Sequence, residues 1–328
     1  MAAFLRVDCA DKAAGKWEWM NPSNGDDRGS ATATISPPHL APPTGIGVRC
    51  EGVVHLYKTF EGHDVVALQG VDLVVQPGER VAFLGPSGSG KSTLLTLFGG
   101  IQRPSAGRIF IGDDEISRMG ERELTKIRAS RVSTMLQGAT RNLLPYATAR
   151  QNLSFARLAP RSAGRPPSLP DAELLARVGL ADQADQVVKT MSGGQRQRLA
   201  LASAVCSSPA LLLADEPTSQ LNHEDRDLML ELIHGLGDEF GTTILVVTHQ
   251  PEVAETFPRT VTMRGGRVGS EGREGAEYVV VGTDGVVHLP AHVAREWPPG
   301  TLVRIEPETR DRLLLSRPEG DEAQEPPR

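Results

Sequence analysis

The hydrophobic and polar positions of this chain alternate in blocks that predict short strands followed by helices. Residues 81–84 form an apolar run, and residues 93–98 carry a helical pattern after an intervening glycine-rich loop. Further along, residues 210–214 are entirely apolar and residues 243–248 have an apolar centre, which is typical of strands covered on both faces. Because a helical pattern near residues 224–236 separates these last two strands, the order predicts a parallel sheet.

Shorter patterns surround this core. Alternating apolar positions predict strands before and after the glycine-rich loop, at residues 47–56, 65–68, 71–75 and 107–112. Residues 118–190 then become polar and helical. The expected fold class is α/β, with a parallel core sheet, an antiparallel β subdomain and a helical subdomain of about residues 118–190, all within one domain spanning residues 48–270.

The two ends of the chain differ from this domain. Residues 1–47 contain a polar stretch at 21–27 and Pro pairs at 37–38 and 42–43 and show no periodicity, so we expect a disordered tail there; residues 317–328 are expected to form a C-terminal tail. Residues 277–316 predict a small β-rich module that resembles the swapped-hairpin barrel of AbrB-like modules, in which two copies pair. The alternative is an edge extension of the main domain without a partner. We expect this module to promote pairing.

Composition narrows the class of protein. The net charge of −6 gives no strong field for nucleic acid, and the C-terminal module has no obvious basic face, so no nucleic-acid partner is expected. The three cysteines show no metal-binding or disulfide spacing, which makes a reducing cytoplasm the expected compartment. No run approaches the ~20 apolar residues that span a bilayer, so any membrane role is expected to come through a partner.

The glycine-rich loop matches the pattern G-x-x-x-x-G-K-[ST] between a strand and a helix. Its glycines let successive backbone N–H groups point at phosphates, and the helix N-terminus adds partial positive charge. Lys91 can reach the β- and γ-phosphates, and the Ser92 hydroxyl can ligate Mg²⁺. The residues expected to hold a nucleotide here are Gly85, Pro86, Ser87, Gly88, Ser89, Gly90, Lys91, Ser92 and Thr93.

Polar residues follow three of the expected strands. Asp215 and Glu216 end the apolar run at 210–214, where Asp215 is suited to hold Mg²⁺ and Glu216 to polarise an attacking water. His249 follows the next strand and could hydrogen-bond the γ-phosphate or position water, and Gln137 could meet both Mg²⁺ and that water. Each of these residues has a purely structural alternative when it is considered without the phosphate loop.

A second pair of glycines opens the helix near residue 194. Gly193 and Gly194, with Ser192 before them and Gln195 after them, form another backbone site for an anion. One chain cannot easily wrap two such sites around the same γ-phosphate. This arrangement suggests that one of the two sites comes from a second subunit.

In this order the motifs resemble the ATP-binding subunit of ABC transporters, over about residues 48–270. Residues 85–93 match Walker A, Gln137 the Q-loop, residues 192–195 the signature motif and residues 211–216 Walker B. Residues 219–222 resemble the D-loop, His249 the switch histidine, and Tyr57 the aromatic residue that stacks on adenine. The signature begins with Met191 where Leu is usual, and the D-loop ends in Asn222 where Asp is usual; for Asn222 the resemblance implies altered coupling between the two sites.

The resemblance implies a P-loop ABC ATPase that forms a homodimer, with each of two ATP molecules held between Walker A of one subunit and the signature of the other. It implies ATP and Mg²⁺ as cofactors and a transmembrane permease as partner, which places the chain at the inner face of the membrane. The segment from Gln137 to residue 153 is similar to the subgroup that exports lipoproteins or peptides, which also includes the ATPase of the cell-division complex. We expect the permease to dock beside residues 138–152.

Two other functions stay open at this point. An ATP-switched regulatory subunit of a membrane complex would have the same ATP site while transporting nothing. ABC proteins that act on ribosomes or DNA usually carry two ATPase cassettes or a long coiled-coil insertion, and this chain shows one cassette. The leading hypothesis is an ATPase subunit that energises a permease for export of an unidentified substrate.

Overall fold

The structure is a computed structural model of the chain. It describes residues 3–6, 45–58, 63–159, 169–273, 276–281, 285–287, 289, 293, 301–309 and 312–316. The chain divides into two compact units. The larger unit comprises Leu40–Pro290, and the smaller unit joins Met1–His39 with Ala291–Arg328.

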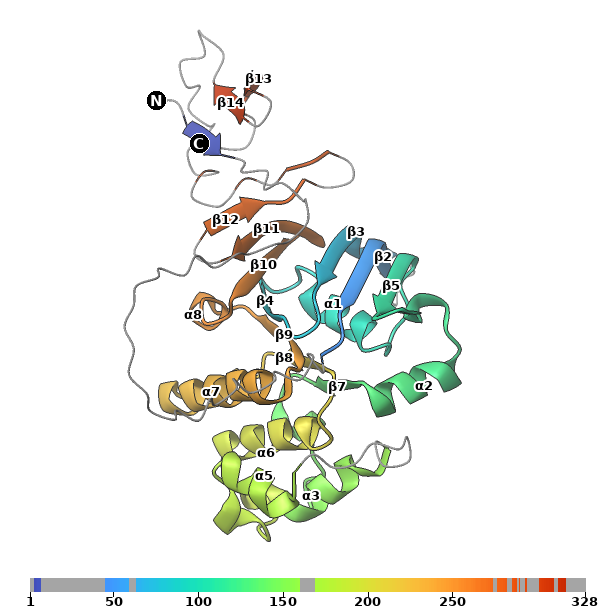
Figure 1. Cartoon of the computed structure of the whole chain (residues 1–328), viewed down its shortest axis with the longest axis vertical. Helices are drawn as coiled ribbons and strands as arrows, with labels where there is room; N and C mark the ends of the chain where they lie inside the picture. Colours follow the sequence, from blue (N-terminus) through green and yellow to red (C-terminus); the bar gives the residue numbers. More distant parts are fainter. Residues whose placement is uncertain are drawn as a thin grey trace, which may run out of the picture. The chain divides into compact units, whose positions relative to one another are not determined.

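A seven-stranded sheet forms the centre of the larger unit, in the order β12-β11-β10-β4-β9-β8-β7 (Figure 1). The strands from β10 to β7 are parallel, while β11 and β12 continue the sheet in antiparallel pairing. Their bounds are β4 Arg80–Leu84, β7 Val132–Met135, β8 Leu211–Asp215, β9 Thr243–Thr248, β10 Arg259–Arg264, β11 Arg267–Arg273 and β12 Ala276–Val279. Every residue of β8 and β9 is buried, as expected for uninterrupted apolar strands covered on both faces. The predicted parallel core sheet is confirmed.

A second sheet of four antiparallel strands lies beside the first, in the order β3-β2-β5-β6. It contains β2 Val48–Lys58, β3 Asp64–Val75, β5 Ala106–Ile111 and β6 Asp114–Glu115. Helix α1 (Lys91–Phe98) contacts strands of both sheets, and its buried Leu94, Leu95 and Phe98 share one apolar cluster with them. This packing fixes the start of α1 at the place where β4 ends.

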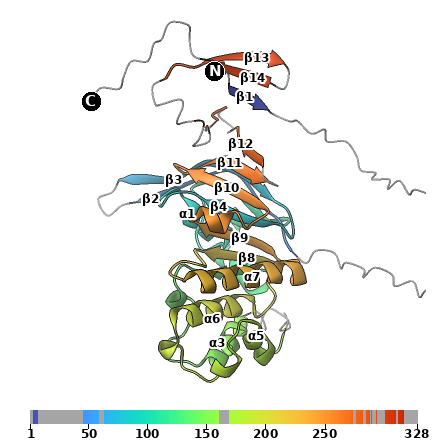
Figure 2. The same ribbon diagram turned by 90° about the vertical axis from the view of Figure 1, so that its left-hand side faces the viewer.

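Helices cover the opposite face of the central sheet. Helices α6 (Gly193–Val205) and α7 (His223–Phe240) share a second apolar cluster with β8 and β9. Both views place α3 (Ala149–Ala156), α5 (Asp171–Arg177) and α6 together at one end of the larger unit (Figures 1 and 2). The remaining helices of the described residues are α2 Glu121–Ser130, α8 Pro251–Ala254 and the 3-10 turns Ile116–Arg118, Ala139–Arg141, Ala181–Gln183 and Val188–Thr190.

Helix α2 lies within the helical subdomain expected over residues 118–190, but its buried residue packs apart from those of the other helices of that segment. It contacts β7, and its buried Leu124 belongs to the apolar cluster of α1 and the two sheets. Helices α3, α5 and α6 contact one another, and their buried residues belong to the other cluster. The helical layer therefore starts after β7 and includes the helix that the signature residues open.

The smaller unit contains a three-stranded antiparallel sheet in the order β1-β14-β13. Its strands are β1 Ala3–Arg6, β13 Arg304–Thr309 and β14 Arg312–Ser316. A strand thus lies inside the segment expected as a tail, because Ala3–Arg6 pairs with Arg312–Leu315. Strand β12, expected in the C-terminal module, instead pairs with β11 and extends the large sheet. The tail expected from residue 317 falls outside the described residues.

None of the helices within the described residues has the length and apolarity that a membrane span requires.

Candidate functional site

The glycine-rich loop lies between the end of β4 at Leu84 and the start of α1 at Lys91. A Cβ atom added to Gly85 would lie 2.2 Å from the backbone oxygen of Met263, and one added to Gly90 would lie 2.5 Å from that of Ala67. Gly90 also has a φ of 95°, a conformation that residues with a side chain rarely adopt. The close approach of β10 and β3 therefore requires glycine at these two positions of the loop.

Lys91 follows the last residue of the loop, and its side chain folds back into the loop. Its Nζ donates hydrogen bonds to the backbone oxygens of Gly85 (2.6 Å) and Pro86 (2.9 Å) and to Oγ of Ser89 (3.3 Å). Burial lowers the pKa of this ammonium, and the nearby carboxylates Glu216 and Asp215 oppose that shift. A cation enclosed by the turn of a phosphate-binding loop can donate the same N–H groups to phosphate oxygens.

The two expected magnesium ligands from α1 and β8 are in contact. Ser92 Oγ donates a hydrogen bond to Asp215 Oδ1 at 3.0 Å. Burial raises the pKa of the Asp215 carboxyl, and the hydrogen bond from Ser92 opposes the shift. A hydroxyl and a carboxylate are oxygen ligands of the kind that Mg²⁺ uses together with substrate phosphates. These side chains therefore fit a magnesium ion beside the loop.

Glu216 and His249 form a second pair at the same edge of the sheet. His249 Nδ1 lies 2.7 Å from Glu216 Oε1, while Oε2 of Glu216 is buried and has no hydrogen-bond partner among the described residues. The backbone N–H of Glu216 donates to the oxygen of Val247 in the neighbouring strand. One carboxylate oxygen is thus oriented by an imidazole, and the other can accept a hydrogen bond from a water molecule.

Parallel pairing explains why these groups meet. Leu84 lies opposite Thr248, Asp215 opposite Val247 and Met135 opposite Ala214. The residues that follow these strands therefore leave from the same carboxyl edge, as in other open parallel sheets. The structure places the exposed Gln137 at this edge too, two residues after β7.

Tyr57 projects from β2 and connects the second sheet to α1. Its hydroxyl donates to Gln102 Oε1 at 2.9 Å and lies 3.2 Å from Thr93 Oγ1. Its ring makes an edge contact with His55, with 4.7 Å between the ring centroids. The partly exposed ring therefore lies close to the helix that follows the phosphate loop.

Ser192 and Gln195 are used to start helix α6. Ser192 is the N-cap, its Oγ accepts from the backbone N–H of Gln195 at 3.2 Å, and Gln195 Oε1 accepts from the backbone N–H of Ser192 at 2.9 Å. This capping box uses neither the hydroxyl proton of Ser192 nor the N–H of Gly193, and both residues are exposed. Within the described part of the chain, neither Ser192 nor Gln195 forms a hydrogen bond with the loop at residues 85–93.

Two contacts beside the site were not expected from the sequence. Asn222 caps helix α7, because its Oδ1 accepts from the backbone N–H of Asp225 at 2.7 Å. Gln197 Nε2 donates to the backbone oxygen of Pro217 at 2.6 Å. An Asn ahead of a helix is a recognisable cap signal, whereas no sequence pattern pairs Gln197 with Pro217.

The fold and this edge of polar residues define a P-loop ATPase, and comparison with known proteins gives the family. Residues 68–219 match the family model described as ABC transporter. The chain is 39% identical over 220 residues to the lipoprotein-releasing system ATP-binding protein LolD 1 of Caulobacter vibrioides, covering 66% of this chain and 93% of that protein. It is 39% identical over 219 residues to the methionine import ATP-binding protein MetN of the same organism, covering 66% of this chain and 64% of MetN.

A solved structure agrees with these relatives. The dimeric post-hydrolysis state of the ATP-binding cassette MJ0796, bound to ADP and Pi, matches 69% of this chain and 98% of its own, with a TM-score of 0.62 and 33% sequence identity. The chain belongs to the ABC transporter family. It is an ATP-binding subunit that hydrolyses ATP, and it is similar to the subunits of lipoprotein-exporting systems. The predicted family and enzyme class are confirmed.

Proposed function

We propose that this chain binds ATP with Mg²⁺ and hydrolyses it to energise a membrane permease that exports a substrate. The observation that carries the proposal is the meeting of two polar pairs, Ser92 with Asp215 and His249 with Glu216, at the sheet edge where Lys91 ends the phosphate loop. The exporter subunit LolD 1 and the importer subunit MetN are equally similar to this chain, and the resemblance of residues 137–153 to the exporting subgroup supports export.

The residues of the site divide the chemistry among them. Lys91 and the backbone N–H groups of the glycine-rich loop hold the β- and γ-phosphates, and Tyr57 stacks on adenine. Ser92, Asp215 and Gln137 hold the magnesium ion, which when bound neutralises charge on the phosphates. Glu216 accepts a proton from the attacking water, and His249 orients that carboxylate and the γ-phosphate.

The outward-facing first turn of α6 supports a homodimer. Ser192 and Gly193 are exposed and keep donors that the capping box does not use. In the proposed dimer, residues 192–195 of one subunit bind the γ-phosphate of ATP held by the loop of the other. The dimeric cassette structures among the similar proteins support this arrangement.

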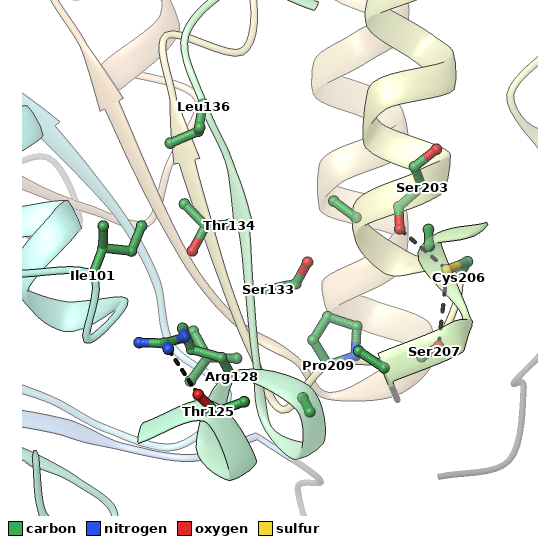
Figure 3. Close-up of a pocket in the computed structure, with 15 residues that line it drawn as sticks. Ile101, Thr125, Arg128, Ser133, Thr134, Leu136, Ser203, Cys206, Ser207 and Pro209 are labelled. Carbon is green, nitrogen blue, oxygen red and sulfur yellow. Dashed lines mark hydrogen bonds between the residues drawn. The ribbon is translucent and has the colours of Figure 1, made fainter. Parts of the chain in front are cut away.

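A groove along the edge strand β7 supports the docking of a permease. It encloses about 480 Å³ and is lined by Ile101, Arg128, Leu136, Ser203 and Cys206, among others. Figure 3 shows Ile101 and Arg128 on one side of β7 and Ser203 and Cys206 on the other. Large apolar side chains are exposed on segments that border it, namely Ile101, Phe155 and Leu158, and on the segment that follows Gln137, namely Leu144 and Tyr146.

A cytoplasmic segment of the permease with apolar side chains fits this groove, since exposed apolar patches of this kind mark interaction surfaces. Such docking would hold the chain at the inner face of the cell membrane. The groove is lined by Leu136, which precedes Gln137 and residues 138–152, the segment beside which we expect the permease to dock.

Photo-cross-linking tests this docking. A photoreactive amino acid at Tyr146, which is 79% exposed, should capture an integral membrane protein in the membranes of the native organism. The same group at Leu228, an exposed position on α7, is the control. The captured protein, reconstituted in vesicles with this chain, should stimulate its ATPase activity and move a substrate. Capture of that membrane protein from position 228 but not 146, or stimulation of hydrolysis without any transport, would contradict the proposal.

A further inference from the structure

Helix α6 is joined to the turn that carries Glu216 by a buried hydrogen bond. Gln197 is only 4% exposed, and its Nε2 donates to the backbone oxygen of Pro217 at 2.6 Å. Gln197 lies about one turn beyond Gly193, while Pro217 directly follows Glu216. The bond therefore connects the helix that the signature residues open with the residue next to the proposed catalytic base.

The turn at residues 216–219 is held tightly. Glu216 has a φ of 49°, and its backbone oxygen accepts from the N–H of Ser219 at 3.1 Å. Its own N–H donates to Val247 of β9, and the ring of Pro217 fixes the next φ angle. Because the turn has few free dihedral angles, a displacement of the Pro217 oxygen is passed to the Glu216 side chain.

A second contact connects the same two segments. A Cβ atom added to Gly194 would lie 2.5 Å from Oδ2 of Asp225, so the Asp225 carboxylate packs directly against the start of α6. Asp225 is in the first turn of α7, where its backbone N–H donates to the side chain of the N-cap residue Asn222. The segment from Glu216 to Asp225 is therefore attached to α6 near both of its ends.

We propose that Gln197 is a positioning residue that couples the two ATP sites of the dimer. The inference rests on the proposed function, in which residues 192–195 contact ATP held by the partner subunit. When that ATP engages the first turn of α6, Gln197 transmits the resulting position of the helix to Pro217. The carboxylate of Glu216 in the subunit's own site is then aligned, so each site hydrolyses ATP efficiently only when the other is occupied.

The test compares Gln197→Met with the matched control Gln186→Met. Methionine keeps the length of the side chain and removes the N–H donor. Gln186 Nε2 also donates to a backbone oxygen, that of Thr190 at 3.2 Å, but it lies on the exposed surface of the helical layer. Gln197→Met should lower kcat by about tenfold to a hundredfold, the loss typical of a small misplacement of a catalytic group. Its Hill coefficient for ATP should fall towards one.

Other measurements separate positioning from a merely structural role. ATP binding to the isolated Gln197→Met subunit should be unchanged, and in a Glu216→Gln background ATP should still drive dimer formation. A structural role would lower the melting temperature and leave the Hill coefficient as it is in the natural protein. The Gln186→Met control should match the natural protein in kcat and Hill coefficient.

Asp225→Ala provides an independent variant, because Asp225 is only half-buried and the backbone cap of α7 remains. It should lower the Hill coefficient less than Gln197→Met does. Unchanged kcat and Hill coefficient in folded Gln197→Met overturn the proposal, as does an unchanged Hill coefficient in Asp225→Ala if Gln197→Met fails to fold. If the natural protein hydrolyses ATP without cooperativity and without an ATP-driven dimer, the proposed dimer itself is wrong.

Discussion

Among the residues of the site, Glu216 combines a strained backbone with a carboxylate that is only half satisfied. A φ of 49° is uncommon for a residue with a side chain and costs on the order of 1–3 kcal/mol. Its carboxylate is buried, with Oε1 bonded to His249 and Oε2 without a partner in the described part of the chain. Such strain persists when the surrounding structure holds the residue in place, here through the bond to Val247.

Glu216→Gln separates binding from hydrolysis. Glutamine has nearly the same shape but is a far poorer base, so the hydrolysis rate should fall by about 10²–10⁴-fold. ATP binding should survive, because Lys91 and the loop N–H groups provide it. The uncleaved nucleotide should then hold two subunits together, and sizing the variant with and without Mg-ATP measures this dimer. A monomer in both conditions, with ATP demonstrably bound, would rule out the shared site in the isolated subunit.

Lys91→Ala is the matching control for that experiment. Lys91 carries the only positive charge among residues 85–91. The substitution removes this charge together with the hydrogen bonds to Gly85 and Pro86. This variant should therefore lose both ATP binding and the ATP-stabilised dimer.

At the scale of single elements, helix α7 carries a histidine whose charge affects stability. His234 is half-buried, its Nε2 lies 3.3 Å from Thr256 Oγ1, and its ring packs on Phe257. Burial, and next the charge of Arg80, lower the pKa of His234 below its ordinary value of 6.5, while Asp238 opposes the shift. The folded protein therefore favours the neutral imidazole more than the unfolded chain does.

The sign of the pH dependence follows from proton binding. Below pH 6.5 the unfolded chain protonates His234 more readily than the folded chain, so this part of the stability is complete above pH 6.5 and is lost as the pH falls below it. His234→Gln should lose less stability than the natural protein between about pH 7.5 and about pH 5.5. Denaturant unfolding at each pH measures the difference, with His223→Gln on the same helix as control. An equal loss in His234→Gln would contradict the assignment.

At the scale of the whole molecule, the smaller unit joins the two ends of the chain. Strand β1 near the N-terminus pairs with β14 near the C-terminus, and every residue of the ATP site lies in the other unit. Leu302 and Ile305 expose apolar side chains at and beside strand β13. Because these side chains are exposed and the ATP site lies elsewhere, we still propose that this unit promotes pairing between two copies of the chain.

Removing the smaller unit tests that role. A chain of residues 40–290 should fold and bind ATP, because both apolar clusters of the larger unit are retained. In the absence of nucleotide it should self-associate less than the full chain, as measured by analytical ultracentrifugation. The full-length Lys91→Ala variant controls for association through ATP. Self-association that is unaltered in the folded, shortened chain would show that the pairing role is wrong.

Much of the fold and the site could be predicted because the signals are local in sequence. The strand, glycine-rich loop and helix around Lys91 follow one another directly, and the apolar run before Asp215 announces a buried strand that ends in carboxylates. Since residues that follow parallel strands leave from one edge, the meeting of Gln137, Asp215, Glu216 and His249 at that edge also follows from the order of elements. The residue roles assigned to them stay predictions.

Only the tertiary structure decided contacts between segments that are distant in the sequence. An apolar strand pattern does not specify its neighbour, so the pairing of β12 with β11 and of β1 with β14 could not be deduced. The bond from Gln197 to Pro217 likewise depends on how α6 packs against the central sheet. The sequence by itself determined which chemical groups stand at the ends of strands and helices, because short-range patterns set those elements. The packing of distant elements determined which of these groups act on one another.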